Sequence, residues 1–383
     1  MNDLEFSIHV LSQGFMTWHR IANKGLVKLS DRSKLNDPKR DTVYPQTFRL
    51  MHKGSLCTLS RCVGSGRYSV VYARDQFAFK RVHTSCDATL RLACKDLLYM
   101  HSLRSPFVMR ALASQIVMEH GQIVKIIHQM PLAQGTLADC QSASLGPTAF
   151  ATRWQWLQDV AMGLLYLHQS GVVHGDVKAA NILRMAGGRA CITDLGLSTF
   201  AEKTAFDTPL ASLHWAPPEA LSGLGYSCAS DVWSFGLLCL NTFLGTTLLK
   251  EVASTEEMLK HWSARLPDIA NQVWSVTMTE QERAMLQRVI AACLCWKPSD
   301  RCTMSEACTL MGLAPLPKPA PMLTCDFAPK MSRALTRRAA TFDPQHLSKI
   351  CRDFDQFLWR AQLSGDDAHS AVFHVLTLCE FAF

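Results

Sequence analysis

The chain of 383 residues has few charged side chains, no long apolar run and no regular cysteine spacing. Charged residues make up 19% and apolar residues 48%, a balance that excludes wholesale disorder. The longest apolar stretch, Phe235–Leu249, contains Asn241 and is too short to cross a bilayer, so it is typical of a buried helix. No G-x-y triplet or heptad register runs through the chain, which excludes collagen and coiled coil.

The 15 cysteines are odd in number and include no Cys-x-x-Cys pair. A disulfide framework or a structural zinc site needs regular spacing, so we interpret them as reduced, mostly buried thiols. The N-terminus lacks the basic head and apolar run of a signal peptide. The net charge of +7 is mild and spread along the chain, so no direct nucleic-acid binding is expected. We expect an intracellular protein without a membrane span, in the cytoplasm or nucleus.

The first part of the chain is rich in short strand patterns. Residues 1–56 show little periodicity and are interpreted as an N-terminal extension. Short β-rich runs over 57–82 and at Gln122–Met130 predict antiparallel strands. Between them, apolar residues at helical spacing predict a helix over 87–103.

The rest of the chain is mainly helical in pattern. From residue 151 an apolar face predicts a long helix that Gly171 ends. A proline-rich linker and a tail follow over 315–383, with one amphipathic helix expected around 344–362. Further helices are expected near 217–222, 230–245, 255–265, 279–295 and 303–312.

A glycine-rich segment, Gly64-Ser-Gly66, lies between two expected strands. Glycines let backbone N–H groups approach phosphate oxygens, although an ordinary turn shows the same pattern. A strand follows this segment instead of a helix, so it is no dinucleotide-binding turn. Lys80, on the next strand, can bridge two phosphates of a nucleotide, but a lone strand lysine usually belongs to a solvated surface.

The most informative stretch follows the long helix. It reads His174-Gly175-Asp176-Val177-Lys178-Ala179-Ala180-Asn181 and combines a proton acceptor, a phosphate-facing cation and a metal-binding amide. Further on, Thr193-Asp194-Leu195-Gly196 places a carboxylate at the end of an apolar strand. Mg²⁺ prefers carboxylates and substrate phosphates as ligands. These segments together predict a site for a magnesium-bound nucleotide.

In this order the motifs resemble the eukaryotic-type protein kinase domain, over roughly residues 57–314. Ala216-Pro-Pro-Glu219 resembles the A-P-E motif of that family. Asp231-Val-Trp-Ser-Phe-Gly236 resembles its large buried helix, and Lys297-Pro-Ser-Asp-Arg301 the segment whose arginine pairs with the A-P-E glutamate. The resemblance implies an α+β, bilobal fold: an N-lobe of about 57–130 with a small antiparallel sheet and one main helix, and a mostly helical C-lobe of about 131–314. ATP would bind in the cleft between the lobes.

The resemblance also assigns roles. Asp176 would orient the substrate hydroxyl or accept its proton, Lys178 would steady the γ-phosphate, and the hydroxyl of Ser212 would reach both. Asn181 and Asp194 would hold Mg²⁺. The residues that would bind ATP are Val63, Gly64, Ser65, Gly66, Arg67, Tyr68, Ser69, Val71, Ala78, Lys80 and Leu183, with Val71, Ala78 and Leu183 around the adenine.

Several positions depart from the family pattern. Ser69 stands where the third glycine is usual, and Leu195 replaces the phenylalanine of D-F-G. The helix over 83–104 contains no glutamate, so Asp96 would pair with Lys80, unless it is an exposed carboxylate. Gly175 replaces the arginine of H-R-D, which ordinarily receives a phosphate on the activation segment. We therefore expect activity that does not depend on phosphorylation between Asp194 and Glu219.

The missing arginine, the short hairpin before Lys80 and the extensions at both ends together resemble herpesvirus-encoded protein kinases, which would imply a host nucleus or virion location. The run from Lys178 to Asn181 resembles the serine/threonine branch. The expected function is therefore ATP-dependent phosphorylation of protein serine and threonine, with Mg²⁺ as cofactor. Two alternatives stay open: a small-molecule phosphotransferase similar to aminoglycoside and choline kinases, which share the His-Gly-Asp and Asn pattern, and a non-catalytic pseudokinase scaffold.

Overall fold

The computed structural model describes residues 5–11, 16–21, 48–52, 55–59, 61–66, 69–83, 93, 96, 99–100, 103–119, 122–141, 150–200, 213–244, 254–265 and 278–314. These residues belong to two compact units. The first is built from residues within 1–103 and 110–132, and the second from residues within 104–109 and 133–314. The linker after residue 314 and the expected tail helix lie outside the described residues.

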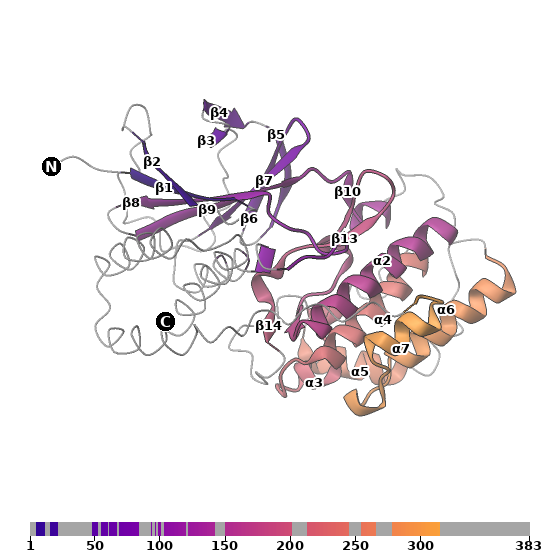
Figure 1. The fold of residues 1–383 in the computed structure, drawn as a ribbon. Coiled ribbons are helices and arrows are strands. Elements are labelled where there is room, and N and C mark those ends of the chain that lie inside the picture. The colour runs from indigo at the N-terminus through magenta and orange to yellow at the C-terminus, as the bar shows by residue number, and fades with distance from the viewer. Residues whose placement is uncertain are drawn as a thin grey trace. The chain divides into compact units, whose positions relative to one another are not determined.

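Among the described residues of the first unit, seven strands form an antiparallel sheet in the order β2-β1-β8-β9-β7-β6-β5 (Figure 1). A separate hairpin pairs β3 with β4. The strands are β1 (Glu5–Leu11), β2 (Met16–Ile21), β3 (Phe48–His52), β4 (Ser55–Leu59), β5 (Arg61–Ser65), β6 (Ser69–Arg74), β7 (Phe77–His83), β8 (Ala113–Glu119) and β9 (Gln122–Pro131).

The two faces of the β6–β7 hairpin carry different kinds of side chain. Asp75, with φ of 53°, makes the tight turn between the strands, a conformation that aspartate tolerates better than most residues. Tyr72 lies opposite Phe79, and Val71 lies opposite Lys80. Because side chains alternate along a strand, one face carries the apolar cluster and the other carries Val71, Ala78 and Lys80. The cluster consists of Leu59, Val70, Tyr72, Phe79 and Ile127.

Three strands, β1, β2 and β3, lie within residues 1–56, for which the sequence predicted none. β1 pairs with both β2 and β8, so residues before 22 extend the sheet at one edge. Phe6, Ile8 and Val10 alternate with polar residues along β1, which is the period of a half-buried strand. This short alternation of apolar and polar residues was the sequence feature from which β1 could have been predicted.

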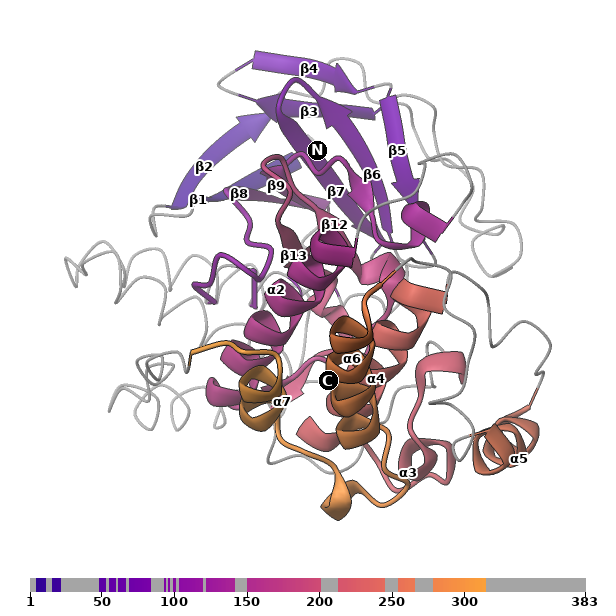
Figure 2. The ribbon, with the colours of Figure 1, turned by 90° about the vertical axis from the view of Figure 1, so that its right-hand side faces the viewer.

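The second unit is mostly helical, as predicted, and its helices are α2 (Phe150–Gln169), α3 (Pro218–Leu221), α4 (Cys228–Leu244), α5 (Thr255–Arg265), α6 (Glu280–Cys293) and α7 (Met304–Leu310). α2 contacts α4 and α7, and α6 contacts α4 and α7 (Figure 2). Capping boxes begin α6 at Thr279 and α7 at Thr303. Gly171, with φ of 74°, follows the end of α2. The α+β division expected from the sequence is thus confirmed.

Short strands position the chemistry-bearing segments of this unit. They form a sheet of β10 (Gly135–Thr136), β12 (Ile182–Arg184) and β13 (Ala190–Ile192), and a second pair of β11 (Val172–Val173) with β14 (Thr199–Phe200). α2 packs so closely on β13 that a Cβ on Gly163 would lie 2.7 Å from Ile192 Cδ1.

The segment 104–109, which the sequence analysis placed in the N-lobe, groups with the second unit. The Ile192 N–H donates to the Phe107 carbonyl at 2.8 Å, and the Met109 N–H donates to the Ile192 carbonyl at 2.7 Å. The Arg104 N–H also donates to the Tyr166 hydroxyl at 2.7 Å. The backbone bonds to Ile192 attach the segment to β13, and the bond to the Tyr166 hydroxyl attaches it to α2.

Candidate active site

An ion pair between Lys80 and Asp96 lies inside the first unit. Lys80 Nζ is 2.7 Å from Asp96 Oδ2, and the two residues are only 6% and 1% exposed. Asp96 is helical, as are the buried Ala93, Tyr99 and Met100, so their spacing of three and four places one helical face inward. The shorter acid therefore does meet the lysine, and the interpretation of Asp96 as an exposed carboxylate is wrong.

The face that bears Lys80 also carries two of the residues expected around adenine. Ala78 lies two residues before Lys80 on β7, and Val71 lies opposite Lys80 on β6. Ala78 is buried and Val71 is half-buried. The third, Leu183, is half-buried on β12 of the second unit, opposite Cys191.

Gly64, near the end of β5, and Gly66, in the loop that follows, are not required to be glycine by backbone conformation or close packing. The Gly66 N–H donates to the Ser69 carbonyl at 2.8 Å, which closes the turn. A Cβ on Gly64 or Gly66 would meet its nearest neighbour only at 3.9 Å, and neither residue needs a positive φ. The open space supports a role in admitting a ligand close to the backbone. Val63 is exposed, and Arg67 and Tyr68 lie outside the described residues.

In the second unit, two side chains converge on the carboxylate of Asp176. Lys178 Nζ lies 2.6 Å from Asp176 Oδ2. Asn181 Nδ2 donates to the same oxygen at 2.9 Å and to the Asp176 carbonyl at 2.8 Å. The single 3-10 turn η4 (Ala179–Asn181) sets this spacing, because it turns Asn181 back toward Asp176. Asp176 is only 6% exposed, so these charge-assisted bonds fix its orientation.

Asp194 is placed beside that group by backbone bonds. The Thr193 N–H donates to the Asn181 carbonyl at 2.9 Å, and His174 Nε2 lies 3.1 Å from the Thr193 carbonyl. Asp194 itself has φ of 66°, a left-handed conformation that is rare outside glycine, and its side chain does not cap the turn η5 (Leu195–Leu197) that follows. Strained residues of this kind gather at functional sites.

The chemistry of these groups suits a magnesium ion held partly by a substrate. Asn181 uses Nδ2 for Asp176, so its Oδ1 is the atom that can face a cation, and Asp194 supplies a carboxylate. Across the described residues no cluster of three or more His, Cys, Asp or Glu side chains could hold a metal. Mg²⁺ usually takes one or two protein oxygens and completes its shell with water and phosphates, which fits this donor set.

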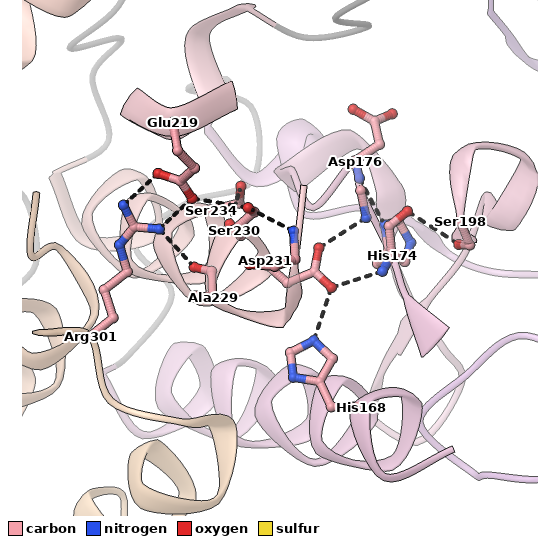
Figure 3. A network of polar contacts seen from close by, with 12 residues as sticks. His168, His174, Asp176, Ser198, Glu219, Ala229, Ser230, Asp231, Ser234 and Arg301 are labelled. Atoms are coloured by element: carbon pink, nitrogen blue, oxygen red, sulfur yellow. Dashed lines mark hydrogen bonds and ion pairs between the residues drawn. The ribbon is translucent and has the colours of Figure 1, made fainter. Parts of the chain in front are cut away.

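The buried carboxylate of Asp231 anchors the segment that carries Asp176 (Figure 3). It accepts hydrogen bonds from the backbone N–H groups of His174 at 2.7 Å and Gly175 at 2.9 Å. His168 Nε2 lies 2.9 Å from the same carboxylate. The motif around Asp231 is recognisable in the sequence, but no role was predicted for this residue. Asp231 is the one acidic residue of the very apolar α4 and lies at its start, and this position in the sequence could have indicated a role.

His174 joins this anchor to the strand end before Asp194. Its ring is fully buried, its Nδ1 accepts the Asp176 N–H at 3.2 Å, and its Nε2 therefore carries the hydrogen that faces the Thr193 carbonyl. The Ser198 hydroxyl donates to the His174 carbonyl at 3.2 Å. Tyr226 lies within electrostatic reach of this region: burial, then the charges of Asp176, Asp231 and Glu219, raise the pKa of its hydroxyl.

Glu219 and Arg301 form a bidentate ion pair, with both nitrogen–oxygen distances 2.7 Å (Figure 3). Ser230 Oγ also donates to Glu219, at 2.9 Å. The Arg301 guanidinium, fully buried, donates to three backbone carbonyls and lies over the Trp233 ring, 5.0 Å from its centre. The structure thus brings together the pair that the sequence analysis expected. Ser212 lies outside the described residues.

Comparisons with known proteins agree with these motifs. The family model described as the protein kinase domain matches residues 57–310. The serine/threonine-protein kinase hippo of Drosophila melanogaster is 27% identical over 301 residues, which cover 73% of this chain and 39% of hippo. Serine/threonine-protein kinase 4 homolog A of Dictyostelium discoideum is 30% identical over 227 residues, which cover 54% of this chain and 44% of that protein.

A third relative is named as inactive. It is an inactive leucine-rich repeat receptor-like serine/threonine-protein kinase of Arabidopsis thaliana, 32% identical over 154 residues, or 39% of this chain and 24% of its own length. The chain thus spans less than half the length of each of these relatives. In the part of the chain that the structure describes, no helix is both long enough and apolar enough to cross a membrane.

Proposed function

Because this chain belongs to the protein kinase domain family, we propose that it transfers the γ-phosphoryl group of ATP to serine and threonine hydroxyls of protein substrates. One observation carries the proposal: Lys178 and Asn181 both donate to Oδ2 of Asp176. Two donors on one oxygen leave Oδ1 of Asp176 to accept the hydrogen of an incoming hydroxyl. Asp176 thereby aims the acceptor oxygen and takes its proton.

The remaining residues supply position and charge. Lys178, with part of its side chain exposed, steadies the transferred phosphoryl group, and Lys80 neutralises the neighbouring phosphates of ATP. Asn181 and Asp194 hold Mg²⁺, which when bound neutralises negative charge on the phosphate oxygens. Val71, Ala78 and Leu183 contact the adenine. In phosphoryl transfer of this kind the protein forms no covalent bond with the substrate. Positioning of the reacting groups and neutralisation of their charge therefore account for most of the expected rate acceleration.

The absence of a side chain at position 175 supports activity without activation-segment phosphorylation. Gly175 has φ of 77°, and its N–H is held by Asp231. This position therefore offers no cation that a phosphate could pair with. The serine/threonine branch rests on the Lys178-to-Asn181 run and on the similarity to the serine/threonine-protein kinases of Drosophila and Dictyostelium. The viral subgroup and an intracellular location, in the cytoplasm or nucleus, are part of the same proposal.

A transfer assay tests the function. The purified chain is incubated with γ-labelled ATP, Mg²⁺ and a mixed pool of proteins, beside Asp176→Asn as the matched control. We expect labelled phosphoserine and phosphothreonine from the wild type and a loss of about 10³-fold or more in the variant. Label on tyrosine alone would contradict the serine/threonine assignment.

The two alternatives give different results in the same assay. A small-molecule phosphotransferase would label an aminoglycoside or choline and no protein. A pseudokinase scaffold, which the departures at Ser69, Asp96 and Leu195 and the inactive relative support, would bind Mg·ATP without transferring label to any acceptor. Fluorescent-nucleotide displacement measured beside the transfer assay separates binding from turnover.

A further inference from the structure

A histidine that no motif includes lies directly beside the Lys80–Asp96 pair. His128 is on β9, where it is the register partner of Lys80 on β7 and of Ser114 on β8. Register partners point to the same face of a sheet, so the ring lies on the lysine side. His128 is 0% exposed and Ser114 is 2% exposed.

Both ring nitrogens face named polar groups. His128 Nδ1 lies 2.8 Å from the Ser114 hydroxyl oxygen. His128 Nε2 lies 3.8 Å from Asp96 Oδ2, the same oxygen that Lys80 Nζ contacts at 2.7 Å. Among the residues that the structure describes, no group comes within hydrogen-bond distance of Nε2. A fully buried N–H in this position needs a nearby acceptor, and the Asp96 carboxylate lies beside it at 3.8 Å.

The neutral ring has one arrangement that satisfies both neighbours. Burial, then the charge of Lys80, lowers the pKa of His128 from 6.5 to about 3, so the ring carries one hydrogen at neutral pH. With that hydrogen on Nε2, the ring presents a positive edge to Asp96 while Nδ1 accepts the Ser114 hydroxyl. With the hydrogen on Nδ1, a lone pair would face the carboxylate instead. The first tautomer is therefore favoured.

We propose that His128 is a positioning residue: its Nε2–H holds the Asp96 carboxylate against Lys80, and Ser114 fixes the ring in that tautomer. The need arises because Asp96 is one methylene shorter than the glutamate usual in the family, so a second contact keeps the acid in place. This role rests on the proposed function, since it acts through Lys80 on the phosphates of ATP. Ser114, His128 and Asp96 do not form a hydrolytic triad, because all three are buried and the serine contacts Nδ1.

The first test does not depend on activity. Long-range ¹⁵N–¹H spectra of the full chain labelled in histidine report which nitrogen carries the hydrogen, and His128→Gln identifies the signal by its disappearance. We expect a neutral Nε2–H pattern that does not change between pH 5 and 8. A hydrogen on Nδ1, or a midpoint inside that range, would overturn the proposal even if the protein is an active kinase.

The second test is kinetic. His128→Leu should raise KM for ATP and lower kcat, each by about tenfold, with KM for the protein substrate unchanged. His128→Gln, which keeps a donor, should lose about threefold or less. Asp96→Glu should impair the wild type, because His128 Nε2 already lies 3.8 Å from the Asp96 carboxylate, but restore His128→Leu to within about threefold. Gln129→Leu, on the opposite face of β9, is the matched control and should change neither parameter.

The two tests separate the inference from the proposed function. Failure of Asp96→Glu to rescue His128→Leu in a folded protein, judged by an unchanged melting temperature, contradicts the positioning role. Absence of phosphoryl transfer in the wild type contradicts the proposed function, and the tautomer measured by NMR then still decides whether His128 faces Asp96 as argued.

Discussion

The carboxylate of Asp231 accepts the backbone N–H of His174 at 2.7 Å, although the two residues are 57 positions apart. Through this bond, and a second to Gly175, the first turn of α4 fixes the backbone from which Asp176 projects. Buried carboxylates that accept several N–H bonds hold a loop more rigidly than side-chain packing alone. The relationship makes Asp231 a positioning residue for Asp176.

Asp231→Asn should therefore impair turnover more than nucleotide binding. The amide can accept one backbone N–H, but its NH₂ group opposes the other, so the segment shifts. We expect kcat to fall about 10²-fold with KM for ATP changed less than about threefold, and stability to fall by about 1–3 kcal/mol. Steady-state kinetics and urea unfolding measure both. Thr242→Val removes a buried hydroxyl from the same helix, far from His174, and should leave kcat unchanged; an equal loss in both variants would contradict the assignment.

Breaking the Glu219–Arg301 pair should unfold the second unit readily. Glu219→Gln leaves the Arg301 guanidinium buried without its counter-charge, which typically costs about 3–5 kcal/mol. Denaturant unfolding should also show strong coupling in a double-mutant cycle with Arg301→Met. Lys260→Ala, in the exposed Lys260–Glu256 pair on α5, is the control and should cause no measurable change. If the losses in the free energy of unfolding caused by Glu219→Gln and Arg301→Met were additive, the two side chains would not be coupled, which would contradict the prediction.

The buried His128 predicts a pH dependence of stability. Its pKa is lowered from 6.5 to about 3, so below pH 6.5 the unfolded chain takes up a proton that the folded chain does not. This contribution is complete above pH 6.5 and is lost as the pH falls toward 3, with a slope of about 1.4 kcal/mol per pH unit. Urea unfolding at pH 7.5 and pH 5 should show an extra loss of about 2 kcal/mol in the wild type relative to His128→Gln. If the free energy of unfolding depended on pH equally in the wild type and in His128→Gln, this prediction would be refuted.

Activity should survive removal of the activation-segment threonines. With glycine at position 175, there is no arginine in the H-R-D position to receive a phosphate. The triple substitution of Thr199, Thr204 and Thr208 by alanine should keep kcat/KM within about tenfold of the wild type. Phosphatase treatment of the wild type, with mass spectrometry to verify phosphate removal, is the companion measurement and should likewise leave the rate near its starting value.

Sequence reasoning found the parts of the site that are continuous in the chain. The Asp176-to-Asn181 run depends on one short turn, so residue types and spacing are enough to predict that the side chains meet. The Lys80–Asp96 pair could be predicted only by helical spacing from Met100, and the structure forms it. The helices of the second unit followed from apolar periodicity, and their bounds lie within a few residues of the prediction.

What sequence reasoning missed depends on contacts between distant segments. Nothing local distinguishes His128 in an apolar run from an ordinary core histidine, because its partners come from β7, β8 and the helical residue Asp96. Asp231 holds a segment more than fifty positions earlier in the chain, and the charge of Asp176 in that segment helps raise the pKa of Tyr226. The strand β1 was missed because its partner β8 is also far away, and a single short alternation predicts a strand weakly.

The Arg301 guanidinium connects Glu219 with the carbonyls of Ala229, Cys295 and Trp296, so four points from three parts of the chain share one side chain. Amide protons at these points should then exchange with deuterated solvent as one cooperative group, since none can open while the guanidinium stays in place. The residues around Glu219, which follow the activation segment, are thus held by a side chain from the segment between α6 and α7. Their rate of opening, measured by exchange, should depend on the stability of α6 and α7 as well as on their own contacts.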